Sequence, residues 1–168
     1  AADIAAISTK AISGLRTESV AALTSDQIKA LTTATVAVFS SEQFNALTSD
    51  QLKALTTKQL ASIKAAHIKS LSTDDVSSLT PDQIASLATA AIAGMSTAQI
   101  GSLTTLQLEA LTPAQVKALT STQLAVLKAE DLATFSSEDM AAISAKAIQG
   151  ITSGTLAALT PDKIAALS

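Results

Sequence analysis

The sequence repeats every eight residues from end to end, and this period constrains the possible fold more than any other feature. When the second apolar residue of each unit is numbered position eight, positions five and eight are apolar in all twenty-one copies. Position five runs from Ile4 to Ile164 and position eight from Ile7 to Leu167, with no insertion. The consensus Thr-(Thr/Ser/Pro)-Asp-Gln-Ile-x-Ala-Leu is clearest at residues 80–87. A fixed short period predicts a repeat architecture rather than an ordinary globular domain.

Each octad carries the signals that start a helix. Ser or Thr at position one is a good N-cap, and Pro, where it occurs, stands at position two, the first helical position. An acidic residue at position three interacts favourably with the helix dipole, and Gln at position four completes a capping box. Six-residue helices of roughly 9 Å are therefore expected. Examples of the four positions are Thr80, Pro81, Asp82 and Gln83.

Other local structures fit this pattern less well. Eight residues of continuous helix turn by roughly 800°, so the apolar pair would drift around the axis. In a strand, positions five and eight would point to opposite faces. A β-solenoid with turns at the Thr pairs stays open as an alternative. The sequence predicts an all-α solenoid of twenty-one units, in which short helices, unstable alone, stack on neighbouring repeats.

Composition excludes several function classes. There is no Cys, Trp or Tyr, which removes thiolate chemistry and leaves few aromatic surfaces. The net charge is −3 and the eleven Lys and Arg residues are scattered, so nucleic-acid binding is not expected. Polar residues interrupt every apolar run well before the ~20 residues of a membrane-spanning helix. No signal peptide is visible.

A weaker, longer repeat overlies the octads. The Ser/Thr cap is missing at Arg16, Lys64, Ala88 and Lys128, and the units starting at Lys64 and Lys128 begin alike. We predict a single array, residues 1–168, with a superrepeat of 64 residues starting near 1, 64 and 128. The array is expected to be part of a longer one. If the superrepeat follows the superhelix, one turn would hold two, four or eight octads.

No pattern of residues predicts an active site, a metal site or a cofactor site. His67 is the only histidine and stands at position four, where it is expected to cap its helix. Capping also explains the acidic pairs better than calcium binding does. Gly at position seven, after Ala at position four, indicates close packing, and Lys at position six marks a solvated face. The acidic pairs are Asp74-Asp75, Glu130-Asp131 and Glu138-Asp139; the glycines are Gly14, Gly94 and Gly150; the lysines are Lys29, Lys53, Lys69 and Lys117.

The octads resemble repeat tracts of large bacterial secreted or surface proteins of the adhesin type. The resemblance covers the whole chain and rests on the Leu-Thr-(Thr/Pro)-Asp-Gln-Ile-x-Ala-Leu consensus. It implies an extracellular, extended and non-catalytic segment that spaces or presents other domains. The uncapped units at Arg16, Lys64, Ala88 and Lys128 depart from the consensus.

Three functions follow as hypotheses. The first is a structural spacer whose partners are neighbouring repeats, with end-to-end self-association as a variant. The second is a peptide- or glycan-binding solenoid using positions three, four and six. The third is an ice-binding ladder of Thr pairs, although the first Thr of each pair is already needed as an N-cap. These pairs include Thr32-Thr33, Thr56-Thr57 and Thr104-Thr105.

Overall fold

The computed structural model describes residues 8–167, in which each octad forms one short helix. Nineteen are α-helices of four to six residues, one is a 3-10 helix, and this part of the chain contains no strand. The all-α prediction is confirmed, and the β-solenoid alternative is wrong. The elements are α2 Thr9–Ser13, α3 Thr17–Ala21, α4 Ser25–Ala30, α5 Thr33–Ala37, α6 Ser41–Asn45, α7 Ser49–Ala54, α8 Thr57–Leu60, α9 Ala65–Ser70, α10 Thr73–Ser78, α11 Pro81–Ser86, α12 Thr89–Gly94, α13 Thr97–Gly101, α14 Thr105–Glu109, α15 Pro113–Ala118, α16 Ser121–Leu124, α17 Ala129–Ala133, α18 Ser137–Ala142, η1 Ile148–Gly150, α19 Ser153–Ala157 and α20 Pro161–Ala165.

Each helix begins and ends where the octad requires. The position-one residue has extended backbone, as at Thr80 with φ −72° and ψ 157°, and its hydroxyl accepts the N–H of Gln83 at 3.2 Å. At the other end the N–H of Leu87 donates to the carbonyl of Ile84 at 3.1 Å, and the chain turns out of the helix. No described residue outside glycine has a positive φ, so these turns need no special residue.

The four units without a Ser or Thr cap keep the same register. Helices α3, α9, α12 and α17 follow Arg16, Lys64, Ala88 and Lys128 directly, without a hydrogen bond from the position-one side chain. Their position-five residues are 0% exposed. Burial of the apolar pair therefore maintains these units where the cap is lost.

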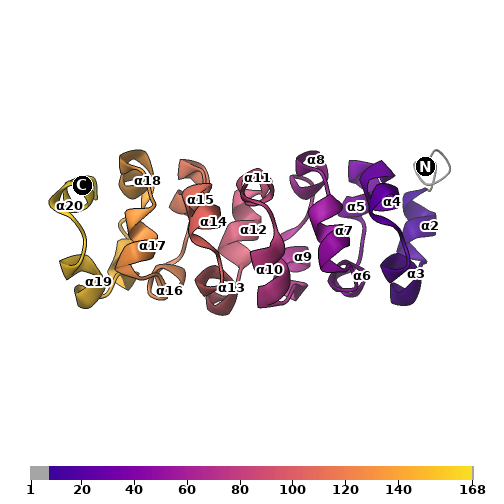
Figure 1. Cartoon of the computed structure of the whole chain (residues 1–168), viewed down its shortest axis with the longest axis horizontal. Coiled ribbons are helices and arrows are strands. Elements are labelled where there is room, and N and C mark those ends of the chain that lie inside the picture. The colour runs from indigo at the N-terminus through magenta and orange to yellow at the C-terminus, as the bar shows by residue number, and fades with distance from the viewer. Residues whose placement is uncertain (1–7, 168) are drawn as a thin grey trace.

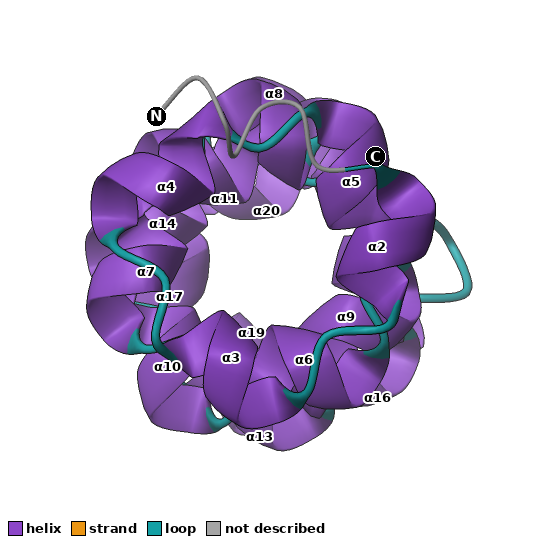
Figure 2. Ribbon diagram, turned by 90° about the vertical axis from the view of Figure 1, so that its right-hand side faces the viewer, coloured by secondary structure: helices purple, strands orange, loops and turns teal. Residues whose placement is uncertain are grey.

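The helices wind into a superhelix whose axis is the long axis of the molecule (Figures 1 and 2). The strongest contacts join units three apart, such as α9 with α12 and α12 with α15. Side-chain hydrogen bonds link the units with a buried Gln at position four to carbonyls 28 and 31 residues earlier, as Gln115 to Leu87 and Ile84. One turn thus holds between three and four octads, and none of the expected values of two, four and eight matches the 28-residue offset.

The core is a continuous apolar lining inside this winding. Position-five side chains from Ile12 to Met140 are 0–1% exposed, and position-eight side chains from Leu31 to Leu127 are 2–7% exposed. The apolar side chains of each turn are buried by residues of the neighbouring turns, because no six-residue helix can bury its own apolar face. None of the helices in residues 8–167 has the length and apolar content needed to cross a membrane.

Two of the position-seven glycines pack against the preceding turn, as predicted. A Cβ on Gly94 would lie 2.9 Å from the Cβ of Ala65, and one on Gly150 would lie 1.8 Å from the carbonyl oxygen of Ser121. Gly14 differs: a Cβ there would meet only carbonyls of its own unit, at 3.5 Å or more. No described residue stands 29 positions before Gly14, so the packing predicted for this glycine stays a prediction.

Replacing Gly150 tests this packing. We expect Gly150→Ala to lower the free energy of unfolding by about 3 kcal/mol, because the methyl group would collide with the backbone of Ser121. Gly101→Ala is the matched control at a helix end, where the nearest atom would be 3.9 Å away. It should stabilise by about 0.5–1 kcal/mol. Urea unfolding of both variants checks this, and equal losses would contradict it.

Candidate functional site

The polar feature that dominates the interior is a row of buried glutamines at position four, which we call the glutamine ladder. These glutamines are 1–4% exposed and point from one turn of the superhelix to the preceding turn. The members are Gln43, Gln51, Gln59, Gln83, Gln99, Gln107, Gln115 and Gln123.

Gln115 shows the geometry of one rung. Its Oε1 accepts the N–H of Thr112 at 2.9 Å, and this is the capping bond predicted from the sequence. Its Nε2 donates to the carbonyls of Leu87 at 2.7 Å and Ile84 at 2.9 Å in the previous turn. The Leu87 carbonyl lies between two helices and accepts no helical bond. A single amide therefore satisfies a helix start and a helix junction that would otherwise be unpaired.

His67 fills one rung of the ladder with an imidazole. Its Nδ1 accepts the N–H of Lys64 at 3.2 Å, and its Nε2 lies 2.9 Å from the carbonyl oxygen of Phe39. Only the neutral tautomer with hydrogen on Nε2 satisfies both contacts. The ring stacks on Phe44 at a centroid distance of 5.1 Å. The predicted capping role is confirmed, and the inter-turn bond adds to it.

Burial lowers the pKa of His67 from its ordinary value of 6.5; the Phe39 carbonyl acts in the opposite direction, and the charge of Lys64 adds to the lowering. The unfolded chain therefore binds the proton more readily than the folded chain.

His67 should accordingly make the array sensitive to acid. The full stability is present above pH 6.5 and is lost as the pH falls from there through the lower pKa of the folded state. A proton on Nδ1 would face the N–H of Lys64, which removes the capping bond. Chemical unfolding at several pH values across this range should show that the free energy of unfolding of the native chain declines as the pH falls. His67→Gln keeps an acceptor and a donor at this position, so its decline should be smaller; equal declines would contradict the assignment.

Lys163 also takes a ladder position, and its Nζ donates to the carbonyl of Phe135, 28 residues earlier. Asp75, Asp131 and Asp139 keep the capping half and lack the bond to an earlier carbonyl, although Asp75 Oδ1 also accepts the hydroxyl of Ser49 at 3.5 Å. Their Oδ2 atoms accept the position-one N–H at 3.3, 2.8 and 2.9 Å. The capping role predicted for these acids is confirmed. Within residues 8–167 no group of three or more His, Cys, Asp or Glu residues is placed to hold a metal ion.

Two of the units with Ala in place of Gln differ in how they pack on the preceding turn. At Ala91, the glycine three residues later brings α12 against Ala65. At Ala147, the unit forms η1 instead of an α-helix, and a cavity of about 240 Å³ remains. This cavity is lined by Leu119, Thr120, Ser121, Ser144, Lys146 and Ala147.

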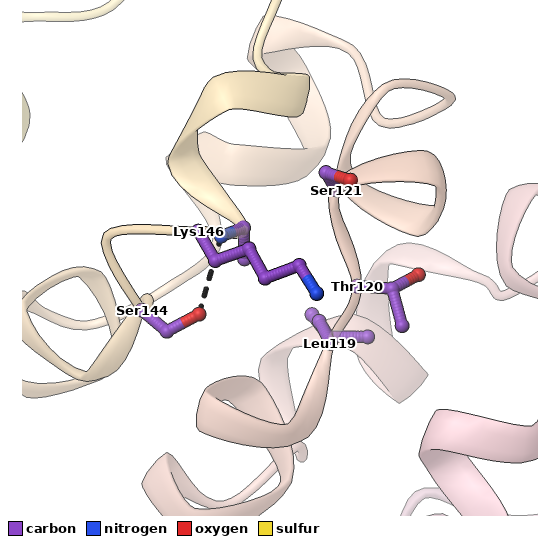
Figure 3. A pocket seen from close by; sticks show the side chains of 6 residues that line it. Leu119, Thr120, Ser121, Ser144 and Lys146 are labelled. Atoms are coloured by element: carbon purple, nitrogen blue, oxygen red, sulfur yellow. Dashed lines mark hydrogen bonds between the residues drawn. The ribbon is translucent and has the colours of Figure 1, made fainter.

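The Lys146 side chain extends across this cavity toward Leu119 and Thr120 (Figure 3). The Ser144 hydroxyl accepts the N–H of Ala147 at 3.2 Å, so it is engaged as a cap. The Thr120 hydroxyl likewise caps α16, so the cavity offers an ammonium group and the hydroxyl of Ser121, but no general base or nucleophile pair. Chemically it is a small polar pocket where the ladder is interrupted.

Sequence reasoning found the capping half of the ladder and missed the inter-turn half. A signal was present: Gln recurs at position four, directly before the apolar position five that the pattern assigns to the interior. A polar residue that recurs on a buried face requires a partner. The carbonyl 28 residues away could not be chosen without knowing the number of octads per turn.

The geometry defines the class of protein: an all-helical repeat superhelix. The sequence profile of the ALTTAQ repeat matches residues 1–33, 28–57, 57–89 and 85–113, and the chain belongs to this repeat family. Successive matches begin 27, 29 and 28 residues apart, close to the 28-residue register of the ladder. The family repeat therefore corresponds to about one turn of the superhelix. No curated protein matches the chain.

The ladder predicts a large and specific effect of an isosteric exchange. Gln115→Glu keeps the capping oxygen but places an oxygen against the carbonyls of Ile84 and Leu87. We expect a loss of about 2–4 kcal/mol near neutral pH, from the lost donor and a buried, unpaired charge. Gln27 makes the same capping bond and, among the described residues, no bond to an earlier turn, so Gln27→Glu should be nearly neutral. Equal losses in urea unfolding would refute the inter-turn role.

Proposed function

We propose that this array is a non-catalytic spacer that holds a fixed distance between other parts of a larger protein. The observation that supports this best is the constant register of the ladder. The same 28-residue bond recurs from Gln43 to Leu15 through to Gln123 and Met95. A repeated, directional link between turns gives a rod whose length follows the number of octads.

The hydrogen bonding of the buried polar side chains favours a structural role over catalysis. The buried polar side chains that could act as acids, bases or donors are engaged in capping or in bonds between turns, as His67 and Gln115 show. Exposed lysines at position six, such as Lys53 and Lys117, form no ion pair in the described chain. These features are those expected of a scaffold.

The proposed location is outside the cell or on a bacterial surface. The support is the resemblance of the octads to tracts in adhesin-type proteins, whose extended repeats present other domains at a distance. End-to-end association is a possible addition to this role. Leu156 and Ile164 at position five are 40% and 45% exposed, whereas Leu124 at the same position is buried.

A peptide- or glycan-binding role is the second candidate. The cavity beside Lys146 favours it, because a concave polar pocket is the usual form of a small-ligand site. An ice-binding role has less support, since Thr80 and Thr112 use their hydroxyls as N-caps and position two is Pro in both units.

The spacer proposal predicts that length is proportional to repeat number. Duplicating residues 24–79, which comprise seven octads, keeps the register and should lengthen the particle without changing its cross-section. Small-angle X-ray scattering of both chains measures these two dimensions. A cross-section that grows instead, as for a globular particle, would refute the proposal. Dilution of the samples separates lengthening within one chain from end-to-end association.

A further inference from the structure

The unit that starts at Ser144 lacks the amide that the ladder glutamines supply, and a cavity lies at that place. Position four of this unit is Ala147, whereas eight other units have a buried Gln there. The cavity has a volume of about 240 Å³, and Ser144, Ala147 and Leu119 are among the residues that line it. Since one water molecule requires only ~10–15 Å³ of such space, the cavity has room for a small organic molecule.

Two backbone groups of the kind that a ladder amide joins have no partner at this cavity. In a filled unit the amide oxygen accepts the position-one N–H and the amide nitrogen donates to a carbonyl 28 residues earlier, as Gln115 does with Thr112 and Leu87. The corresponding groups here are the N–H of Ser144 and the carbonyl of Leu119, and neither forms a hydrogen bond within the described chain. Both residues line the cavity, and Leu119 is buried.

The unit keeps the helix start that positions the Ser144 N–H. The Ser144 hydroxyl accepts the N–H of Ala147 at 3.2 Å, much as the Thr112 hydroxyl accepts that of Gln115 at 3.3 Å. The Ser144 carbonyl accepts the N–H of Ile148 at 3.0 Å, which is the four-residue bond that begins an α-helix. The change to 3-10 geometry in η1 therefore comes after the cap, and the donor is held as it is in a filled unit.

The charge at the cavity favours an anionic group on the ligand. Lys146 is the only acidic or basic residue among those that line the cavity, and its side chain extends across it toward Leu119 and Thr120 (Figure 3). The ion pair of the described chain joins Lys128 and Glu130, so the ammonium group of Lys146 has no carboxylate partner there. A carboxylate alone would not suit the cavity, because it offers no donor to the Leu119 carbonyl.

We propose that this cavity binds a small molecule that carries both a primary carboxamide and a carboxylate. The carboxamide oxygen accepts the Ser144 N–H, the carboxamide nitrogen donates to the Leu119 carbonyl, and the carboxylate pairs with Lys146. The ligand thus contributes the amide that Gln contributes in other units, and it meets a donor and an acceptor that have no other partner. This inference specifies the ligand chemistry of the pocket named above for the second candidate function, and it does not depend on the spacer role.

Titration of the isotope-labelled whole chain with glutaramate, the monoamide of glutaric acid, tests the site by nuclear magnetic resonance. We expect a dissociation constant on the order of 1 mM, because only a few ligand atoms make contact. The Ser144 N–H resonance should move downfield as it gains a hydrogen bond, and the other shifts should be confined to residues that line the cavity. Glutarate, in which a second carboxylate replaces the amide, should bind at least about tenfold more weakly, because it has no donor for the Leu119 carbonyl.

Two variants separate the amide contacts from the charge. Ala147→Gln provides a tethered amide, so the Ser144 N–H resonance should lie downfield without ligand, and glutaramate binding should be lost. Lys146→Met removes an exposed charge and should weaken glutaramate binding by about threefold. The same variant should leave the affinity for butyramide, which has the amide but no carboxylate, unchanged.

Three results would overturn the proposal. One is the absence of any shift at Ser144 at about twenty times the expected dissociation constant. Another is equal affinity for glutarate and glutaramate, which would make the cavity an anion site formed by Lys146 alone. The third is undiminished glutaramate binding by folded Ala147→Gln; if this variant does not fold, the glutarate comparison and Lys146→Met decide. Failure here would leave the scattering test of the spacer unaffected, because that test depends only on the number of repeats.

Discussion

The bond between a position-four side chain and a carbonyl one turn earlier is the interaction that converts a string of short helices into a superhelix. A six-residue helix gains few internal hydrogen bonds and leaves unpaired groups at both ends. Gln83 pairs with a backbone group at a helix start and with another after a helix end: it accepts the N–H of Thr80 and donates to the Leu55 carbonyl. Each such bond contributes only about 0.5–1.5 kcal/mol, yet a buried carbonyl left without it would cost more. The rung therefore fixes the register as well as the stability.

The arrangement resembles, on a larger scale, the logic of the α-helix itself. In an α-helix, donors point to carbonyls one turn earlier at a constant sequence offset. Here the offset is 28 residues, and Gln51, Gln83 and Gln123 all donate in the same direction, towards the N-terminal side. Because every such bond spans the same number of residues and points in the same direction, successive units are related by the same rotation and shift, and the short helices wind into a superhelix.

Much of the fold could be predicted from the octad alone, because its signals are local. Caps, helix starts and the buried faces at positions five and eight all follow from neighbours within eight residues, and the structure places Thr80, Ile84 and Leu87 accordingly. The number of octads per turn depends on how helices three units apart pack, and the sequence contains no local signal for this. The inter-turn half of each rung depends on that number, as does the pocket beside Ala147, so both were missed. The 64-residue superrepeat, predicted from Lys64 and Lys128, stays a prediction.

The irregular rungs show how far the array tolerates exchange at its central polar position. His67 and Lys163 keep a nitrogen donor, and their units retain α-helix and register. Ala91 offers no donor, and Gly94 compensates by allowing closer contact with Ala65. Ala147 has the same paired glycine, yet its unit becomes a 3-10 helix, since Gly150 meets the Ser121 backbone rather than a side chain. At Ala91 the missing amide is thus offset by the contact of Gly94 with Ala65, 29 residues earlier. Asp139 keeps its capping bond to Ser136, while its buried Oδ1 has no hydrogen-bond partner in the described chain.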